Sequence, residues 1–193
     1  MKSWIVAALL ARSAVAGPIF LAEWYEFGFD PNHFPSVAGC QPADPSGVPC
    51  RAGTTPLLLD TPPWTFSSAG VLNLQITDAF LPGDRFSVYD FGVLIGSTPP
   101  VPVQLAMCGL DPNQCFTDPA FSHATFQLPP GSHSLTVTVQ PAQLLGEGFF
   151  RVLAVPEPAL SMLGGLTLLV FGGLARRRSR RTGADRRHGN GIA

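Results

Sequence analysis

The sequence predicts an all-β body, a β-sandwich or jelly roll, between two terminal segments of different character. Two observations carry this prediction. Apolar and polar residues alternate in short runs through the middle of the chain, as half-buried strands require. Gly-, Pro- and Asp-containing turns separate these runs at the spacing of about 8 to 12 residues that is typical of sandwiches and barrels. No window between the two ends sustains the helical period.

The N-terminus, "MKSWIVAALLARSAVAG", has the three parts of a secretory signal peptide. Lys2 supplies the positive charge, residues 4–10 form a short apolar stretch, and Ala14-Val15-Ala16 is a small-x-small cleavage site. Arg12 shortens the apolar stretch. We expect residues 1–16 to be a signal peptide. A buried N-terminal helix is the alternative.

The body, residues 17–154, is predicted to consist of strands and turns. "PWTFSSAGVLNLQITDAF" contains a half-buried strand around residues 71–76, and Pro82-Gly83 forms the next turn. Phe86 and Val88 precede Asp90-Phe91-Gly92, which predicts a β-hairpin with a short glycine-containing loop. "ATFQLPPGSHSLTVTVQ" predicts two strands around a Pro-Pro-Gly turn, and "GEGFFRVLAV" predicts the last strand.

The four cysteines of the body favour two disulfides, since export leads to an oxidising compartment. Three connectivities are possible. We favour Cys40–Cys50 and Cys108–Cys115, because each pair brackets a Pro- and Asp-rich loop, "CQPADPSGVPC" and "CGLDPNQC". A zinc site is the alternative, but neither spacing is that of a zinc knuckle and no histidine lies beside the cysteines.

Charge is segregated along the chain. Residues 17–155 carry three arginines and eleven carboxylates, a net charge of −8, whereas residues 176–193 carry a net charge of +6. An acidic body lacks the basic face that phosphate binding needs, which argues against a nucleic-acid partner. We also expect no cofactor beyond a possible metal ion, discussed below.

The C-terminal segment combines three features. Pro156-Glu157-Pro158 cannot continue a helix and predicts an extended, accessible peptide. Residues 159–175 contain no charge, and at 1.5 Å per residue they reach the lower limit of a membrane helix. Arg176, Arg177 and Arg178 follow and would hold this end on the cytoplasmic side, which leaves the body outside the cytoplasmic membrane.

This order of parts, over residues 155–181, resembles the PEP-CTERM sorting signal of Gram-negative bacteria. The resemblance implies that exosortase, an integral-membrane enzyme with a proposed cysteine-based transpeptidase mechanism, recognises the segment. It also implies removal of the signal as the protein reaches the cell surface or the exopolysaccharide matrix. This chain departs from the pattern, because the basic tail "TGADRRHGNGIA", residues 182–193, continues beyond the arginines.

The stretch "LQITDAFLPGDRFSVYDFGVLIGST" is similar to segments of secreted bacterial proteins that carry this signal, which implies a β-sandwich and no activity. We therefore expect a non-catalytic structural or adhesive protein, anchored in the membrane only until it is sorted. The alternative is a carbohydrate-binding module that holds exopolysaccharide in a biofilm matrix. Such modules stack aromatic rings on sugars. The candidate rings are Trp24, Tyr25, Trp64, Phe66 and Tyr89.

Residues of the body suggest three kinds of chemistry. Asp78, Asp84 and Asp90 could ligate calcium, although aspartates also serve turns through local hydrogen bonds. Glycoside hydrolysis needs two facing carboxyl groups, and the body's glutamates are Glu23, Glu26 and Glu147. Serine neighbours histidine at Ser122-His123 and at Ser132-His133-Ser134, but strand neighbours point to opposite faces. Turn or surface roles are the simpler interpretation of these histidines.

Overall fold

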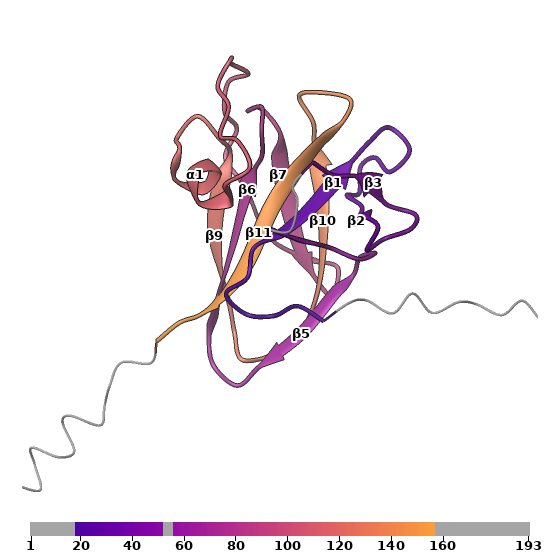
Figure 1. Ribbon diagram of the computed structural model, residues 1–193. Coiled ribbons are helices and arrows are strands. Elements are labelled where there is room, and N and C mark those ends of the chain that lie inside the picture. The colour runs from indigo at the N-terminus through magenta and orange to yellow at the C-terminus, as the bar shows by residue number, and fades with distance from the viewer. Residues whose placement is uncertain (1–17, 52–55, 157–193) are drawn as a thin grey trace, which may run out of the picture. The chain divides into compact units, whose positions relative to one another are not determined.

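The computed structural model describes residues 18–51 and 56–156, and all but one of the regular elements in this part are β-strands, so the all-β prediction is confirmed. Two main sheets face each other across a shared core (Figure 1). One sheet has the order β4 (Leu57–Leu58), β1 (Tyr25–Phe29), β11 (Gly146–Ala154), β6 (Leu72–Asp78) and β9 (His123–Leu128). The other has the order β5 (Trp64–Ser68), β10 (Gly131–Gln140), β7 (Arg85–Asp90) and β8 (Val93–Ser97).

Alternation along the strands fills the space between the sheets. In β10 the predicted apolar positions Leu135, Val137 and Val139 are buried, and the residues between them are more exposed. Aromatic rings from both sheets meet at the centre, where Phe27 contacts Trp64, Phe86 and Phe150. Because each strand places every second side chain on one face, a short sequence pattern is enough to build this core.

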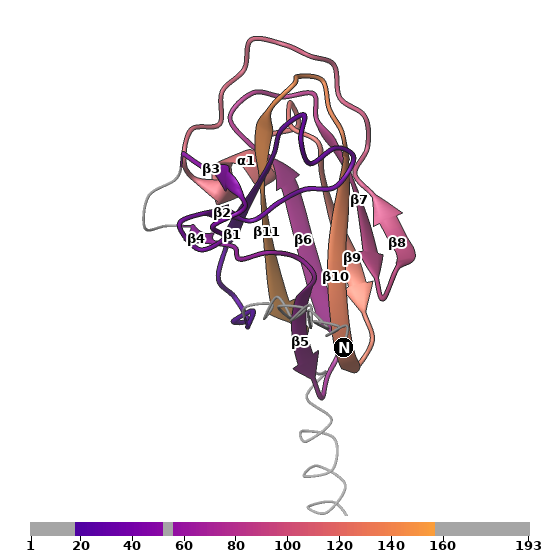
Figure 2. The same cartoon turned by 90° about the vertical axis from the view of Figure 1, so that its right-hand side faces the viewer.

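The predicted hairpin is present as β7 and β8. Phe91 and Gly92 both have positive φ, 48° and 78°, as a two-residue type I′ turn requires. The strand predicted around residues 71–76 is β6, the Pro-Pro-Gly turn joins β9 to β10, and the last predicted strand is β11. β11 lies in the middle of its sheet between β1 and β6 (Figure 2).

A second apolar cluster covers the outer face of the five-stranded sheet. It joins Trp24 and Phe149 to Phe80, Phe121 and the buried disulfide Cys108–Cys115. The sequence pattern did not predict the short helix here, α1 (Pro112–Thr117), which the disulfide ties down. Its start has a local signal, since the Asp111 side chain accepts a hydrogen bond from the N–H of Asn113 and Pro112 follows the cap.

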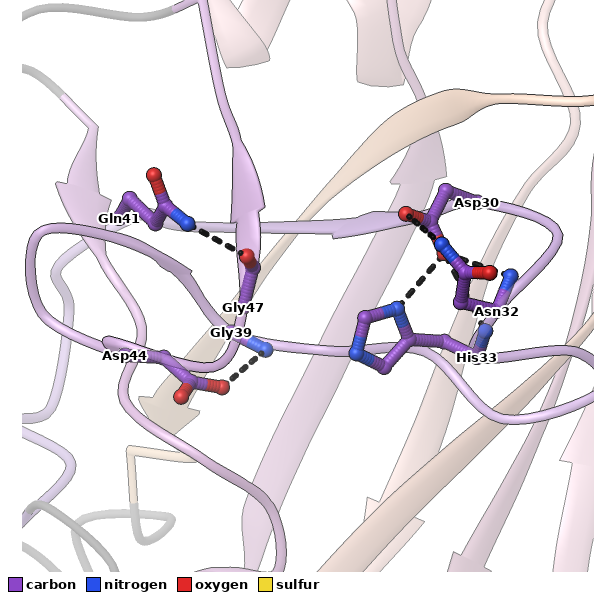
Figure 3. Close-up of polar contacts among 7 residues, drawn as sticks. All are labelled: Asp30, Asn32, His33, Gly39, Gln41, Asp44 and Gly47. Carbon is purple, nitrogen blue, oxygen red and sulfur yellow. Dashed lines mark hydrogen bonds and ion pairs between the residues drawn. The ribbon is translucent and has the colours of Figure 1, made fainter.

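Polar contacts shape the long loop after β1, which contains β2 (Cys40–Gln41) and β3 (Val48–Pro49) (Figure 3). Asp44 accepts a hydrogen bond from the N–H of Gly39 at 3.2 Å, and the Gln41 amide donates to the carbonyl of Gly47 at 3.0 Å. The disulfide Cys40–Cys50 closes the same loop. Burial would raise the pKa of Asp44, but hydrogen bonds from Ser46, Thr61 and Gly39 outweigh it, and the pKa is lowered.

Both disulfides that the sequence favours are therefore formed, with Cα–Cα distances of 5.4 and 4.9 Å. The thiols are paired with each other, which leaves none of the four for the alternative zinc site. No helix within residues 18–51 and 56–156 is long and apolar enough to cross a membrane.

Candidate functional site

Acidic side chains gather at one end of the sandwich, where the β6–β7 loop meets the β10–β11 connection. A small pocket there is lined by Arg51, Phe80, Asp84, Leu145 and Glu147, among others, and its volume is about 40 Å³. We call it the acidic pocket. Its walls come from segments far apart in the sequence, so only the folded chain forms it.

Asp78 lies beside this pocket and holds the β6–β7 loop. One carboxylate oxygen accepts a hydrogen bond from the N–H of Ala79 at 2.8 Å, and the other accepts from Gly83 at 2.9 Å and Asp84 at 3.0 Å. Burial and the charge of Asp84 raise the pKa of Asp78 to about 8, although these hydrogen bonds oppose the rise. The carboxyl group is therefore mostly protonated near neutral pH.

Asp84 links the two loops. Its Oδ1 accepts a hydrogen bond from the N–H of Ala142 at 2.6 Å, and Gly146 packs so close to Oδ2 that a Cβ there would lie 2.7 Å away. Burial raises the pKa of Asp84 to about 6, against hydrogen bonds from the backbone of Ala142 and Gln143. An aspartate in this position fixes the relative placement of loops that are 58 residues apart in the sequence.

Glu147 faces the same pocket from β11. Burial and the charge of Glu26, on the neighbouring strand β1, raise the pKa of Glu147 to about 7, while Arg51 opposes the rise. The Arg51 guanidinium also lies over the Phe80 ring, 5.6 Å from its centroid. Sequence reasoning named Glu26 and Glu147 but did not join them to Asp84 or to Arg51. The sequence did contain a signal for buried acids, because each glutamate stands inside an apolar strand, "YEFGF" for Glu26 and "GEGFF" for Glu147.

The three aspartates proposed as calcium ligands do not share one site. Asp78 and Asp84 lie close together. Asp84 precedes β7 and Asp90 is its last residue, so the two aspartates lie at opposite ends of this strand, about 20 Å apart. Asp90 instead binds His133 and the N–H of Ser134, at 2.8 and 2.9 Å. Local hydrogen bonds, the alternative interpretation, account for Asp78, whereas Asp84 and Asp90 bind partners 58 and 43 residues away in the sequence.

One group in the described part of the chain has the spacing of a metal site, and it consists of Glu26, Cys40 and Cys50. Its two sulfur atoms form a disulfide with each other and lack the thiolate charge that binds a metal. The chemistry of this set therefore does not suit an ion.

The pocket also bears on the hydrolase alternative. Glu26 and Glu147 lie on adjacent strands, offset by two residues in the register, and both are buried, whereas a glycosidase needs two carboxyl groups that flank the bound sugar. Ligand sites measure about 300 to 1,000 Å³. A volume of about 40 Å³ accepts water but not a sugar ring. Glu23 lies on the exposed segment before β1.

The serine–histidine neighbours do not pair with each other. His133 is buried, contrary to the expected surface position, because its Nδ1 contacts Asp90 and its Nε2 contacts the carbonyl of Pro129. His123 Nδ1 contacts the carbonyl of Phe121, and the Ser122 hydroxyl donates to Thr98 or Pro99. None of these contacts activates a serine as a nucleophile.

The candidate sugar-stacking rings divide between the core and the surface. Trp24, Tyr25 and Trp64 are buried, and half-buried Phe66 packs against the core beside His133. Tyr89 is half-buried and lies on the outer face of the four-stranded sheet, since its neighbours Val88 and Asp90 contribute to the inner face. These five rings therefore form no flat, exposed aromatic platform.

The predicted sorting signal lies mostly outside the described residues. Pro156 is described and exposed, while Glu157, Pro158, the apolar run 159–175 and Arg176–Arg178 are not, and neither is the signal peptide 1–16. No family model matches the sequence, and neither the curated proteins nor the solved structures contain a match to it.

Proposed function

We propose that this chain is an exported, disulfide-stabilised β-sandwich that exosortase sorts to the cell surface or extracellular matrix of a Gram-negative bacterium. Its role there is structural or adhesive and not catalytic. The observation that carries the proposal is the position of the signal-like sequence. β11 ends at Ala154, and Pro156-Glu157-Pro158 follows at once. Cleavage in that peptide would remove no strand from the body.

Three features of the body support the proposal. Both cysteine pairs are oxidised, and each closes a local loop, which is the usage expected of an exported domain. The acidic pocket is too small for a sugar or a similar substrate, which favours a non-catalytic role. The buried positions of Trp24 and Trp64 favour a structural or adhesive protein over a module that stacks rings on polysaccharide.

Intact mass spectrometry tests the proposal. The chain is recovered from cells and from the extracellular fraction, with and without exosortase. We expect a mature form that begins near Gly17 and ends near Pro156–Pro158, and we expect it to vanish without exosortase. A full-length C-terminus in both strains would overturn the sorting step.

The chain offers a matched control for this experiment. Pro156→Ala/Pro158→Ala removes the prolines that flank Glu157, and Pro100→Ala/Pro102→Ala removes a Pro-x-Pro pair of the same spacing from the loop after β8. Only the first variant should keep its C-terminal segment. Equal processing of both variants would show that the Pro-Glu-Pro peptide is not what the enzyme recognises.

A further inference from the structure

The chain leaves the sandwich at an end built from four segments. Ala154 pairs with Leu72, and the N–H of Val155 donates to the carbonyl of Val71 at 3.0 Å. Leu72 also pairs with Leu128, so the turns β5–β6 and β9–β10 lie at this same end (Figure 2). We call this the exit end and define it as residues 18–22, 68–72, 128–131 and 154–155.

The N-terminal segment of the body crosses between the sheets near this end. Pro18 forms a bridge to Thr65 on β5, and the N–H of Ala22 donates to the carbonyl of Val152 on β11 at 2.7 Å. Ile19 turns inward and is buried in the core. Phe20 and Leu21 remain 61% and 42% exposed, so this crossing presents apolar side chains to the outside.

The exit end carries little charge. Its four segments, "PIFLA", "SAGVL", "LPPG" and "AV", contain no acidic or basic residue, although exposed Glu23 follows the first of them, and exposed Val71 adds to the apolar surface. The opposite end, where β1 and β6 finish and β7 and β11 begin, holds the acidic pocket and its neighbours. The charged residues there are Asp30, Arg51, Asp78, Asp84, Arg85 and Glu147. Leu144 and Leu145 are also exposed at the acidic end, but anionic headgroups repel the carboxylates there, so the exit end suits the interface of a lipid bilayer better.

Chain length then limits where the exit end can lie. Pro156, Glu157 and Pro158 separate Val155 from the apolar run that begins at Ala159. Three extended residues reach about 10 Å, and the headgroup layer on each side of a bilayer is about 5 to 7 Å thick. If residues 159–175 enter the hydrocarbon core, the exit end therefore lies within a few ångströms of the headgroup layer, close enough for its exposed side chains to reach the headgroups.

We propose that the exit end is a membrane-contacting surface, in which Phe20 and Leu21 insert into the headgroup region of the phospholipid bilayer until the C-terminal segment is removed. This inference rests on the proposed membrane segment. It assigns a partner, a lipid surface, to apolar side chains that the fold leaves exposed. It also holds Pro156–Pro158 at the membrane face, where an integral-membrane enzyme can reach the peptide.

Depth-dependent quenching of tryptophan fluorescence tests this surface. The exported chain is purified with its C-terminal segment from a strain that lacks exosortase. It is then reconstituted into phosphatidylethanolamine–phosphatidylglycerol vesicles with brominated acyl chains. Phe20→Trp is compared with Leu105→Trp, a control at an exposed position in the loop between β8 and α1. Trp24 and Trp64 are buried and provide a common background.

We expect strong loss of fluorescence and a blue shift for Phe20→Trp, and neither for Leu105→Trp. Equal quenching of the two variants would overturn the inference. A blue shift of Phe20→Trp without quenching would overturn it too, because it indicates that a second copy or another protein covers this surface. Carbonate extraction of the same vesicles separates the two proposals. If the chain resists extraction but Phe20→Trp is not quenched, the membrane anchor is present and only the lipid contact of the exit end is refuted. If the chain is extracted, both the membrane anchor and the lipid contact are refuted.

Discussion

The backbone N–H of Asp84 donates a hydrogen bond to Oδ2 of Asp78 at 3.0 Å, which places two buried carboxyl groups side by side at one end of the sandwich. Two like charges in such a place are unfavourable, and burial favours the neutral acids. Glu147, in the same region, has its pKa raised for the same reason. Three acids near one pocket therefore make stability depend on pH.

We expect the free energy of unfolding to fall as the pH rises from about 5 to about 8, by an amount on the order of 5 kcal/mol. The three pKa values in the folded protein, about 8, 6 and 7, lie above those of the unfolded chain. The folded state therefore binds more protons in this window, and deprotonation destabilises it. Below about pH 4 the lowered pKa of Asp44 gives a slope of the opposite sign.

Urea denaturation at a series of pH values measures this dependence. Asp78→Asn and Glu147→Gln replace the acids by neutral groups of similar shape and should flatten the curve between about pH 5 and pH 8. Glu23→Gln, on the exposed segment before β1, is the control and should leave the curve unchanged. If neither Asp78→Asn nor Glu147→Gln changes the pH dependence of the free energy of unfolding, the raised pKa values of these two acids are not its cause.

The more buried pair of His133 and Asp90 should contribute more to stability than the more exposed pair of His33 and Asp30. The contact distances are similar, 2.8 and 2.7 Å, but the side chains are 2% and 17% exposed in the first pair and 31% and 28% in the second. Asp90→Ala leaves a buried ring nitrogen without its partner, which costs about 1 to 3 kcal/mol. Asp30→Ala should cost less, because water replaces the lost contact.

Chemical denaturation of the two alanine variants gives this comparison directly. His133→Gln is a useful third variant, since its amide can still donate to one of the two oxygen acceptors. We expect it to fall between the wild type and Asp90→Ala. Equal costs for Asp90→Ala and Asp30→Ala would mean that burial does not strengthen the pair.

Each disulfide should stabilise the body by about 2 to 3 kcal/mol, because each closes a short loop of the unfolded chain. The sequence separations are 10 and 7 residues. The double variants Cys40→Ala/Cys50→Ala and Cys108→Ala/Cys115→Ala test the two bridges separately in urea. Reducing agent should lower the stability of the wild type and leave a chain with all four cysteines replaced unaffected. A wild type insensitive to reduction would contradict the expected contribution.

Phe91→Asn should stabilise the β7–β8 hairpin by roughly 1 kcal/mol. Phe91 has a φ of 48° and is 66% exposed, so it bears the cost of a left-handed backbone and gains little from burial. Asparagine favours this conformation and the type I′ turn. Val93→Asn, at a similarly exposed position in extended backbone, is the control and should not raise the midpoint of thermal unfolding. A lower midpoint for Phe91→Asn would show that the ring makes a stabilising contact.

Sequence patterns predicted the strands, the hairpin and the disulfides, because each of these depends on residues that are close together in the sequence. Alternation identified β10, glycine after Phe91 identified the hairpin, and proline- and aspartate-rich loops indicated which cysteines pair. The helix α1 was missed because six residues are too few for a period, although its capping aspartate was visible.

The sequence by itself determined an all-β body with two local disulfides, since strand alternation and short loop closures act over only a few residues. The tertiary structure alone decided which acids meet, that His133 is buried against Asp90, and that Trp24 and Trp64 lie in the interior. Asp84 and its partner Ala142 are 58 residues apart, and Asp90 and His133 are 43 residues apart. Such pairs form only when strand register and sheet packing bring distant segments together, and no local pattern encodes that register.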